Sequence, residues 1–314
     1  MSVKSKICLL VLLVVLAIGV YGFQANAPKM PNLAERLGYP AGTKLLIVHG
    51  DDLGVAHSVN QASFQALDKG FISSGSIMVP CSWFPEVAAY GKSHQDADLG
   101  IHLTLTSEWE SYEWGPVAAP DRVASLMDTQ GYLWDTSQLA AASIKPEDAE
   151  REARAQIERA LRAGIRITHL DSHMGTFFTP QLFPVYVKLA REYQVPFFAL
   201  RDPRASPAML QLLTDKDLVL DDFKMAYEAV NPENWTKFYE DLVRGLKPGV
   251  TLLIVHLGFN DSELQGVMTE KAPFGSAWRQ SDFDAVSNPS FAQVLKENKV
   301  TLVGWNDLAA KAAR

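Results

Sequence analysis

The sequence contains very little cysteine. Only Cys8 and Cys81 occur in 314 residues. Cys8 belongs to an apolar N-terminal run that is typical of a targeting segment, so the processed chain would hold Cys81 alone and no internal disulfide could form. Stability must then come from a large core, which a hydrophobic fraction of 47% can supply.

Positive charge is also scarce. Lysine and arginine number 29 against 36 acidic residues, which gives a formal net charge of -7. Phosphate contacts need a basic surface, so we expect no nucleic acid partner. The sequence also lacks internal repeats, low-complexity tracts and an evident linker, and we therefore expect residues 44–314 to form one domain.

The N-terminus has the pattern of a targeting segment. Basic residues precede an unbroken apolar run over residues 7–20, and a small-residue site typical of signal peptide cleavage ends at Ala27. Pro28 would hinder cleavage there, so residues 1–27 are interpreted as a signal peptide or an N-terminal membrane anchor. We expect an exported protein, periplasmic or extracellular, that meets a membrane only through this segment, and a polar lead-in over residues 28–43.

Apolar, β-rich runs alternate with amphipathic segments along the rest of the chain. Strands are expected at residues 45–48, 75–79, 98–106, 165–170, 195–200, 250–255 and 300–305, and helices at residues 85–93, 146–162, 180–193, 233–246 and 288–298. This alternation predicts an α/β fold in which helical crossovers join parallel strands.

Two adjacent carboxylates, Asp51 and Asp52, follow the first strand. A helix with Ser58 as its N-cap and Gly70 just past its end is expected next, which places the pair at the carboxyl end of a strand. In barrels and open α/β folds that end carries the chemistry. Turn formation alone would explain aspartates in a loop, but adjacent like charges repel, and a bound cation relieves this repulsion.

Further polar side chains recur where other predicted strands end. They are His102, His169, Asp171, His173, Arg201 and His256. A single histidine is more often a hydrogen-bonded core residue than a ligand, and His49 is expected to point into the core. Several histidines at one rim beside paired aspartates instead indicate a divalent metal held by one carboxylate and two imidazoles.

The order and spacing of these motifs resemble the YdjC-type carbohydrate deacetylases, the family that includes chitooligosaccharide deacetylase. The blocks that carry the resemblance are Gly50-Asp51-Asp52-Leu53-Gly54 with Val59-Asn60, Gly100-Ile101-His102-Leu103-Thr104-Leu105-Thr106, Thr168-His169-Leu170-Asp171-Ser172-His173, Arg201, His256-Leu257-Gly258 and Arg279-Gln280-Ser281-Asp282. The resemblance covers the chain from Lys44 onward. It implies an irregular, TIM-like (β/α) barrel and the hydrolysis of an N-acetyl group on a sugar, so an N-acetylated sugar is the expected partner.

The resemblance also implies roles for individual residues. Asp52, His102 and His173 would hold a divalent metal ion, with zinc or magnesium expected. Asp51 would be the general base and His256 the general acid. Contacts to the substrate, or support of the metal ligands, are expected from His169, Asp171, Arg201, Trp109, Trp114 and Arg279.

Three positions depart from the family pattern, since Gly175 replaces a histidine, Leu257 a proline and Gly50 an alanine. None of them removes a catalytic group. The residues alone leave two other functions open. A glycoside hydrolase would use Asp51 with a second carboxylate and need no metal, whereas a non-catalytic carbohydrate-binding protein would need neither Asp51 nor His256.

Overall fold

The computed structural model describes residues 31–200, 206–226, 234–268 and 274–314. The chain divides into two compact units, Met1–Pro31 and Asn32–Arg314. The targeting segment expected over residues 1–27 lies outside the described residues. Among the described helices, none combines the length and the apolar character that a membrane span requires.

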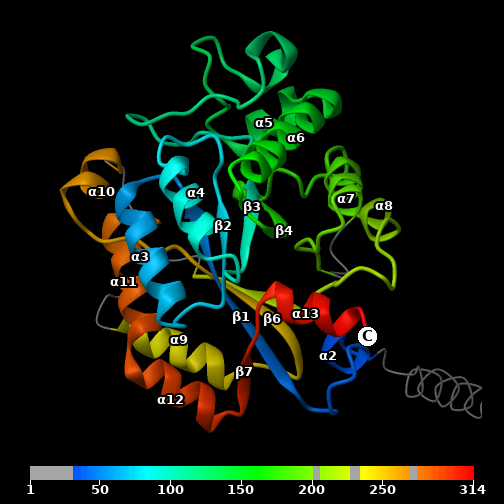
Figure 1. Cartoon of the computed structure of the whole chain (residues 1–314), viewed down its shortest axis with the longest axis vertical. Coiled ribbons are helices and arrows are strands. Elements are labelled where there is room, and N and C mark those ends of the chain that lie inside the picture. Colours follow the sequence, from blue (N-terminus) through cyan, green and yellow to red (C-terminus); the bar gives the residue numbers. More distant parts are fainter. Residues whose placement is uncertain (1–30, 201–205, 227–233, 269–273) are drawn as a thin grey trace, which may run out of the picture. The chain divides into compact units, whose positions relative to one another are not determined.

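The unit Asn32–Arg314 contains one seven-stranded parallel sheet (Figure 1). Its strands are β1 (Lys44–Leu53), β2 (Ser74–Ile77), β3 (Leu99–Leu103), β4 (Ile167–Ser172), β5 (Asp222–Lys224), β6 (Gly249–Val255) and β7 (Val300–Leu302). Their order is β4-β3-β2-β1-β6-β5, and β7 pairs with the first residues of β1. The parallel pairing confirms the α/β class that the alternating pattern predicts.

Isolated bridges continue the sheet between its two edge strands and make it an irregular barrel. Leu170 of β4 pairs with Phe197, and Leu200 pairs with Leu220 just before β5. The strand expected over residues 195–200 is therefore reduced to two bridging positions. Pro196 contributes to this, because it has no N–H group to extend the ladder with β4.

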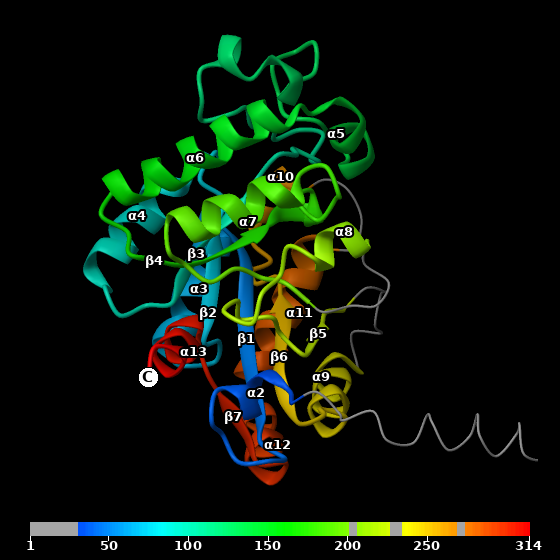
Figure 2. The ribbon, with the colours of Figure 1, turned by 90° about the vertical axis from the view of Figure 1, so that its right-hand side faces the viewer.

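Helices surround the strands (Figure 2). The longer ones are α3 (His57–Asp68), α4 (Phe84–Ser93), α6 (Pro146–Arg162), α7 (Phe183–Glu192), α9 (Trp235–Arg244), α11 (Ser276–Ser287), α12 (Pro289–Glu297) and α13 (Trp305–Ala312), and the shorter ones are α2 (Leu33–Arg36), α5 (Ser137–Ser143), α8 (Pro207–Leu210) and α10 (Ser262–Val267). The sequence pattern misses α11. Its buried face includes Arg279 and Asp282, which interrupt the apolar stripe by which an amphipathic helix is detected.

The start of α3 differs from the expectation. Ser58 lies inside the helix, and Ala56 occupies the N-cap position without a side-chain hydrogen bond. The carboxylate of Glu263 instead accepts the backbone N–H of His57 at 3.0 Å and that of Ser58 at 2.7 Å. Gly70 follows the C-cap with φ of 68°, so its place just past the helix end is confirmed.

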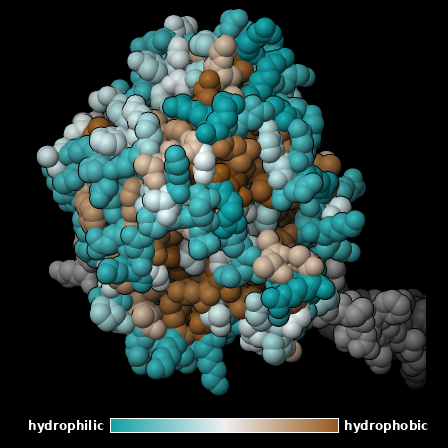
Figure 3. Space-filling model, in the orientation of Figure 1, coloured by the Kyte–Doolittle hydropathy of each residue, from teal (hydrophilic) through white to brown (hydrophobic). Residues whose placement is uncertain are grey.

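The alternation of side chains along β1 sets the direction of Asp51. Leu45 and Ile47 belong to one apolar cluster with Leu252 of β6, whereas Leu46 packs in another beneath α9, α11 and α12. Because strand side chains alternate, Asp51 follows Leu45 and Ile47 on the same side of the strand. The outer surface is mostly hydrophilic on the face shown in Figure 3, with apolar side chains gathered in recesses of that face.

Candidate functional site

The carboxyl ends of β1, β3, β4 and β6 meet around one cavity of about 980 Å³. Of the residues expected at the site, those that line it are Asp51, Asp52, His102, Trp109, Asp171, His173, His256 and Arg279. His169 and Trp114 lie behind this lining, both buried. Arg201 lies outside the described residues.

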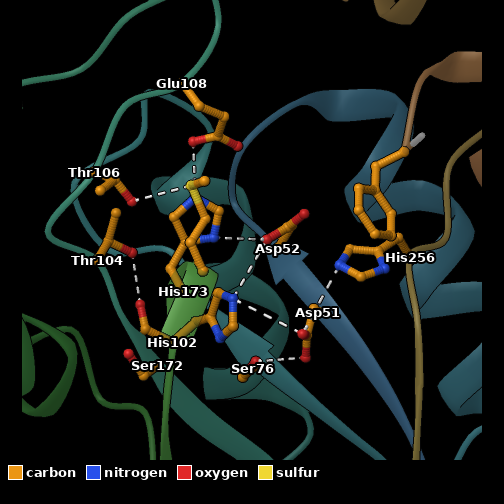
Figure 4. A network of polar contacts seen from close by, with 12 residues as sticks. Asp51, Asp52, Ser76, His102, Thr104, Thr106, Glu108, Ser172, His173 and His256 are labelled. Carbon is orange, nitrogen blue, oxygen red and sulfur yellow. Dashed lines mark hydrogen bonds and ion pairs between the residues drawn. The ribbon is translucent and has the colours of Figure 1, made fainter. Parts of the chain in front are cut away.

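Asp51 and Asp52 belong to the last residues of β1 rather than to the loop that follows it. The register between β1 and β2 shifts between Gly50 and Leu53, and Asp52 has φ of 68°, a left-handed conformation that is uncommon outside glycine. This irregularity turns the two carboxylates apart. Figure 4 shows Asp51 facing His256 and Asp52 facing two other histidines.

Asp52 Oδ1 lies between two imidazoles. It is 3.5 Å from His102 Nε2 and 3.4 Å from His173 Nδ1, and it is buried without a hydrogen-bond partner (Figure 4). These separations exceed those of normal charge-assisted hydrogen bonds. They match the spacing of about 3.4 Å between ligand atoms that tetrahedral bonds of about 2.1 Å would give.

Each of the two imidazoles has a carboxylate on its other nitrogen. His102 Nδ1 is 2.7 Å from Asp171 Oδ1, and His173 Nε2 is 2.9 Å from Glu108 Oε2. Carboxylates in this position fix the ring orientation and the tautomer of metal-binding histidines. Asp52, His102 and His173 therefore fit a divalent cation. Glu108 lies in an irregular segment, and the sequence pattern does not identify it.

The protonation of the two histidines is consistent with this fit. Burial opposes a charge on His173, but the carboxylates of Glu108 and Asp52 raise its pKa to about 10. Burial likewise opposes a charge on His102, whose pKa is nevertheless raised by Asp171 and Asp51. Without a metal, protons therefore neutralise the acidic groups, and a bound cation would replace them.

Two other groups of side chains also bring three donor atoms together, namely His49, His169 and Asp171, and Asp51, His102 and Asp171. Asp171 belongs to both sets. Both of its oxygens already have hydrogen-bond partners, since Oδ1 contacts His102 Nδ1 and Oδ2 contacts His49 Nε2. Neither set contains a buried carboxylate oxygen without a hydrogen-bond partner, although His169 Nε2 of the first set is a buried nitrogen without one, whereas Asp52 Oδ1 is such an oxygen.

The outer oxygen of Asp52 contacts Arg279 of α11. Arg279 is 2% exposed and donates from its terminal nitrogen to Asp52 Oδ2 at 2.7 Å. Burial opposes ionisation of Asp52, yet Arg279 and the nearby histidines hold its pKa well below the usual range. The second terminal nitrogen of Arg279 is buried without a partner, and Arg279 lines the cavity.

His49 provides a cation beneath Asp51. Its Nε2 is 3.0 Å from Asp51 Oδ1 and 2.9 Å from Asp171 Oδ2, and its Nδ1 is 3.0 Å from Ser74 Oγ. Burial opposes its charge, but the hydrogen bonds to Asp171 and Asp51 raise its pKa to about 10. His49 is thus the protonated group that lets two buried carboxylates lie close together.

His256 follows β6 and faces Asp51, with 3.9 Å between its Nε2 and Asp51 Oδ2. Its backbone N–H donates to Asp282 Oδ2 at 2.9 Å. Asp282 Oδ1 accepts from Tyr239 and Trp235 as well, at 2.6 and 2.8 Å, so this carboxylate is held firmly. Burial lowers the pKa of His256 to about 4 although both active-site aspartates oppose the shift, and its ring is neutral at neutral pH.

The remaining expected residues lie one layer deeper. Trp114 Nε1 donates to the backbone carbonyl of Thr106 at 2.8 Å, and its ring packs edge-on at 5.7 Å from that of Trp109, which lines the cavity. His169 stacks on Trp305 at 5.1 Å and receives or donates a hydrogen bond with Thr168 at 2.9 Å. Trp114 therefore supports Trp109 at the cavity, whereas Trp305 and Thr168, the partners of His169, are not among the residues that line it.

Two of the three departures from the family pattern, Gly175 and Gly50, have local physical causes. Gly175 has φ of 65°, a conformation that a histidine would adopt only with strain, and its neighbour Met174 has φ of 49°. A Cβ atom at Gly50 would lie 3.0 Å from Ile72 and 3.9 Å from Leu257. An alanine at position 50 would therefore press against Ile72 and only touch Leu257.

Comparisons with known proteins agree with this geometry. The family described as YdjC-like protein matches residues 45–297. Proteins named carbohydrate deacetylase from Thermus thermophilus and Brevibacillus brevis are 33% and 37% identical over 273 and 271 residues. These alignments cover 85% and 84% of this chain and 94% and 99% of the relatives.

Among solved structures, the crystal structure of a proposed cellobiose-phosphate cleavage protein from Enterococcus faecalis is similar to this chain. It has a TM-score of 0.69 and 24% sequence identity, and the match covers 85% of this chain and 99% of that one. At this level of identity the likeness concerns the fold.

Proposed function

Because the chain belongs to the YdjC-like protein family, we propose that it is a metal-dependent carbohydrate deacetylase that releases acetate from an N-acetylated amino sugar. The observation that carries the proposal is the buried Asp52 Oδ1, which has no hydrogen-bond partner and faces both His102 and His173. The names of the two relatives support the substrate class.

Asp51 is assigned as the general base. A zinc or magnesium ion held by Asp52, His102 and His173 would supply a Lewis acid for the acetyl carbonyl and the water. Asp51 Oδ1 is held by His49 and by Ser76 at 3.3 Å, which fixes the carboxylate. Its Oδ2 is directed toward His256 and takes the proton of the attacking water.

His256 is assigned as the general acid at the leaving nitrogen. Its ring is neutral at rest because burial lowers its pKa to about 4, so it must receive a proton during the reaction before it donates one. Asp51 Oδ2, at 3.9 Å, is positioned to supply that proton. Asp282 holds the backbone of His256 and so aims the ring into the cavity.

Arg279 is assigned to substrate binding. One terminal nitrogen is occupied by Asp52, while the other is buried without a partner on a side chain that lines the cavity. A buried donor of this kind gains most from an acceptor oxygen, such as a sugar hydroxyl or the amide carbonyl.

Acetate release from a panel of N-acetylated amino sugars, measured with and without a strong chelator, tests this function. We expect release by the metal-loaded protein, loss of release after chelation, and recovery when zinc or magnesium is restored. Activity that survives removal of the metal would contradict the mechanism and favour a glycoside hydrolase that works with two carboxylates.

We also propose that the protein is exported by the segment over residues 1–27, since basic residues, an apolar run and a small-residue site follow each other there. N-terminal sequencing of the protein from its host tests this and decides whether Pro28 blocks cleavage. Recovery of the intact chain from the cytoplasm would contradict export.

A further inference from the structure

The lining of the active-site cavity is divided by chemistry. Its ionisable side chains gather around Asp52, at the ends of the strands. The rest of the lining is largely apolar and includes Phe178, Phe198, Leu200, Phe223, Met225 and Ile254. The ring of Phe198 lies 5.6 Å from that of Phe178 and 5.8 Å from that of Phe223, so the three rings form a continuous strip.

This apolar lining continues into a second cavity of about 560 Å³. The two cavities share Phe178, Phe198 and Leu200. Helices α7 and α8 add Phe183, Met209 and Leu210 to the second one, and no charged side chain lines it in the described part of the chain. We call the lining of this second cavity, which includes the three shared residues, the apolar track.

A saccharide fits the apolar track poorly. Each sugar hydroxyl that leaves water needs a hydrogen-bond partner, and the described side chains of the track offer one hydroxyl, that of Ser206, beside aromatic rings and aliphatic groups. An aliphatic chain has no such requirement and gains free energy from burial against these side chains. The first cavity, at about 980 Å³, also exceeds what an acetylated amino group needs.

We propose that the substrate is an N-acylated amino sugar that carries an aliphatic chain, and that this chain lies along the apolar track. The inference rests on the proposed deacetylase function and narrows its substrates to glycolipids. The aliphatic chain can be attached at two places, as the aglycone of the sugar or as the acyl group of the amide itself. In both, water adds to the amide carbonyl, the C–N bond breaks, and the nitrogen takes up a proton, which yields a carboxylate and an amine.

Two series of compounds test the proposal with the metal-loaded full chain. The first contains alkyl glycosides of N-acetylglucosamine from methyl to octyl, used below their critical micelle concentrations. The second contains methyl glucosaminides acylated on nitrogen from acetyl to octanoyl. Release of the free amine gives kcat/KM for every compound. We expect kcat/KM to rise about twofold to fourfold per methylene in one series until the track is filled.

The outcomes separate this inference from the function on which it rests. A rise in the first series assigns the chain to the aglycone, and a rise in the second assigns it to the acyl group. Amine release without a chain-length dependence in either series overturns the inference and leaves deacetylation intact. No amine from any compound contradicts deacetylation itself.

A pair of variants locates the effect. Leu210→Asp places a charge in the second cavity, and Leu210 is not among the residues that line the catalytic cavity. It should lower the ratio of kcat/KM for the longest chain to kcat/KM for the methyl compound at least tenfold. Leu161→Asp, at a position on α6 that is 45% exposed, is the matched control and should change neither value. A chain-length series in Leu210→Asp equal to that of the native protein would overturn the placement of the chain.

Discussion

Replacement of His49 by glutamine should destabilise the metal-free protein by about 3–5 kcal/mol at neutral pH. His49 is 1% exposed and lies between the carboxylates of Asp51 and Asp171. Burial opposes its charge, and the two carboxylates nevertheless raise its pKa from the ordinary 6.5 to about 10. A pKa rise of that size corresponds to a stabilisation of the folded protein by roughly 5 kcal/mol. A glutamine N–H would restore about 1 kcal/mol of this through one hydrogen bond.

The loss of stability in His49→Gln should depend on pH. Because the pKa of His49 in the folded protein lies above that in the unfolded chain, its stabilisation is complete below about pH 6.5 and is lost as the pH rises toward 10. The difference in unfolding free energy between the native protein and His49→Gln should therefore be large at pH 7 and much smaller at pH 10. Urea unfolding followed by circular dichroism, with a chelator present, measures both.

His94→Gln is the matched control. The side chain of His94 is 46% exposed, and its nearest carboxylate, on Asp68, lies 3.9 Å away. Its replacement should change the unfolding free energy by less than about 0.5 kcal/mol. Equal losses in the two variants, or a loss in His49→Gln that does not change with pH, would refute the assignment of His49 as a buried imidazolium.

Three further predictions concern the metal and the acid. Metal affinity should increase with pH below about 10, because the ion displaces protons from His102 and His173, and titration calorimetry in buffers of different ionisation enthalpy should detect proton release. Glu108→Gln should weaken metal binding about 10- to 100-fold in equilibrium dialysis, and an unchanged affinity would mean that Glu108 does not orient His173. Asp282→Asn should keep the metal and lower kcat by roughly 10- to 100-fold as His256 loses its alignment, whereas a normal kcat would refute this role.

The sequence predicts the architecture well where the signal is local. Helix α6 spans Pro146–Arg162 as expected, since a proline, acidic residues and a terminal glycine mark its ends. Asp51, His102 and His256 were expected near strand ends, and the structure brings all three to one cavity. This follows because the carboxyl ends of parallel strands gather at one edge of a sheet.

Partners that are distant in sequence are not predictable in this way. Glu263 caps α3 from 206 residues away, and no local pattern connects it to His57. Asp171 contacts His49 across 122 residues, so His49 looks like an ordinary core histidine until the fold is known. Glu108 lies in a segment without regular secondary structure, so its position in the sequence does not indicate which way its side chain points.

The left-handed conformation of Asp52 is a further feature that the sequence does not reveal. Its φ of 68° depends on the register shift between β1 and β2, and this in turn depends on pairing between separate strands. The conformation nonetheless decides which of two identical neighbouring side chains lies between His102 and His173.

Division of labour between Asp51 and Asp52 is the central claim, and paired asparagine variants test it most directly. Metal content and acetate release would be measured on Asp51→Asn and Asp52→Asn after loading with the same ion. Asp51→Asn should retain the metal and lose turnover by a factor of roughly 10²–10⁴, the contribution of a general base. Asp52→Asn should lose metal and turnover together. Near-normal turnover in metal-loaded Asp51→Asn, or full metal content in Asp52→Asn, would contradict the account.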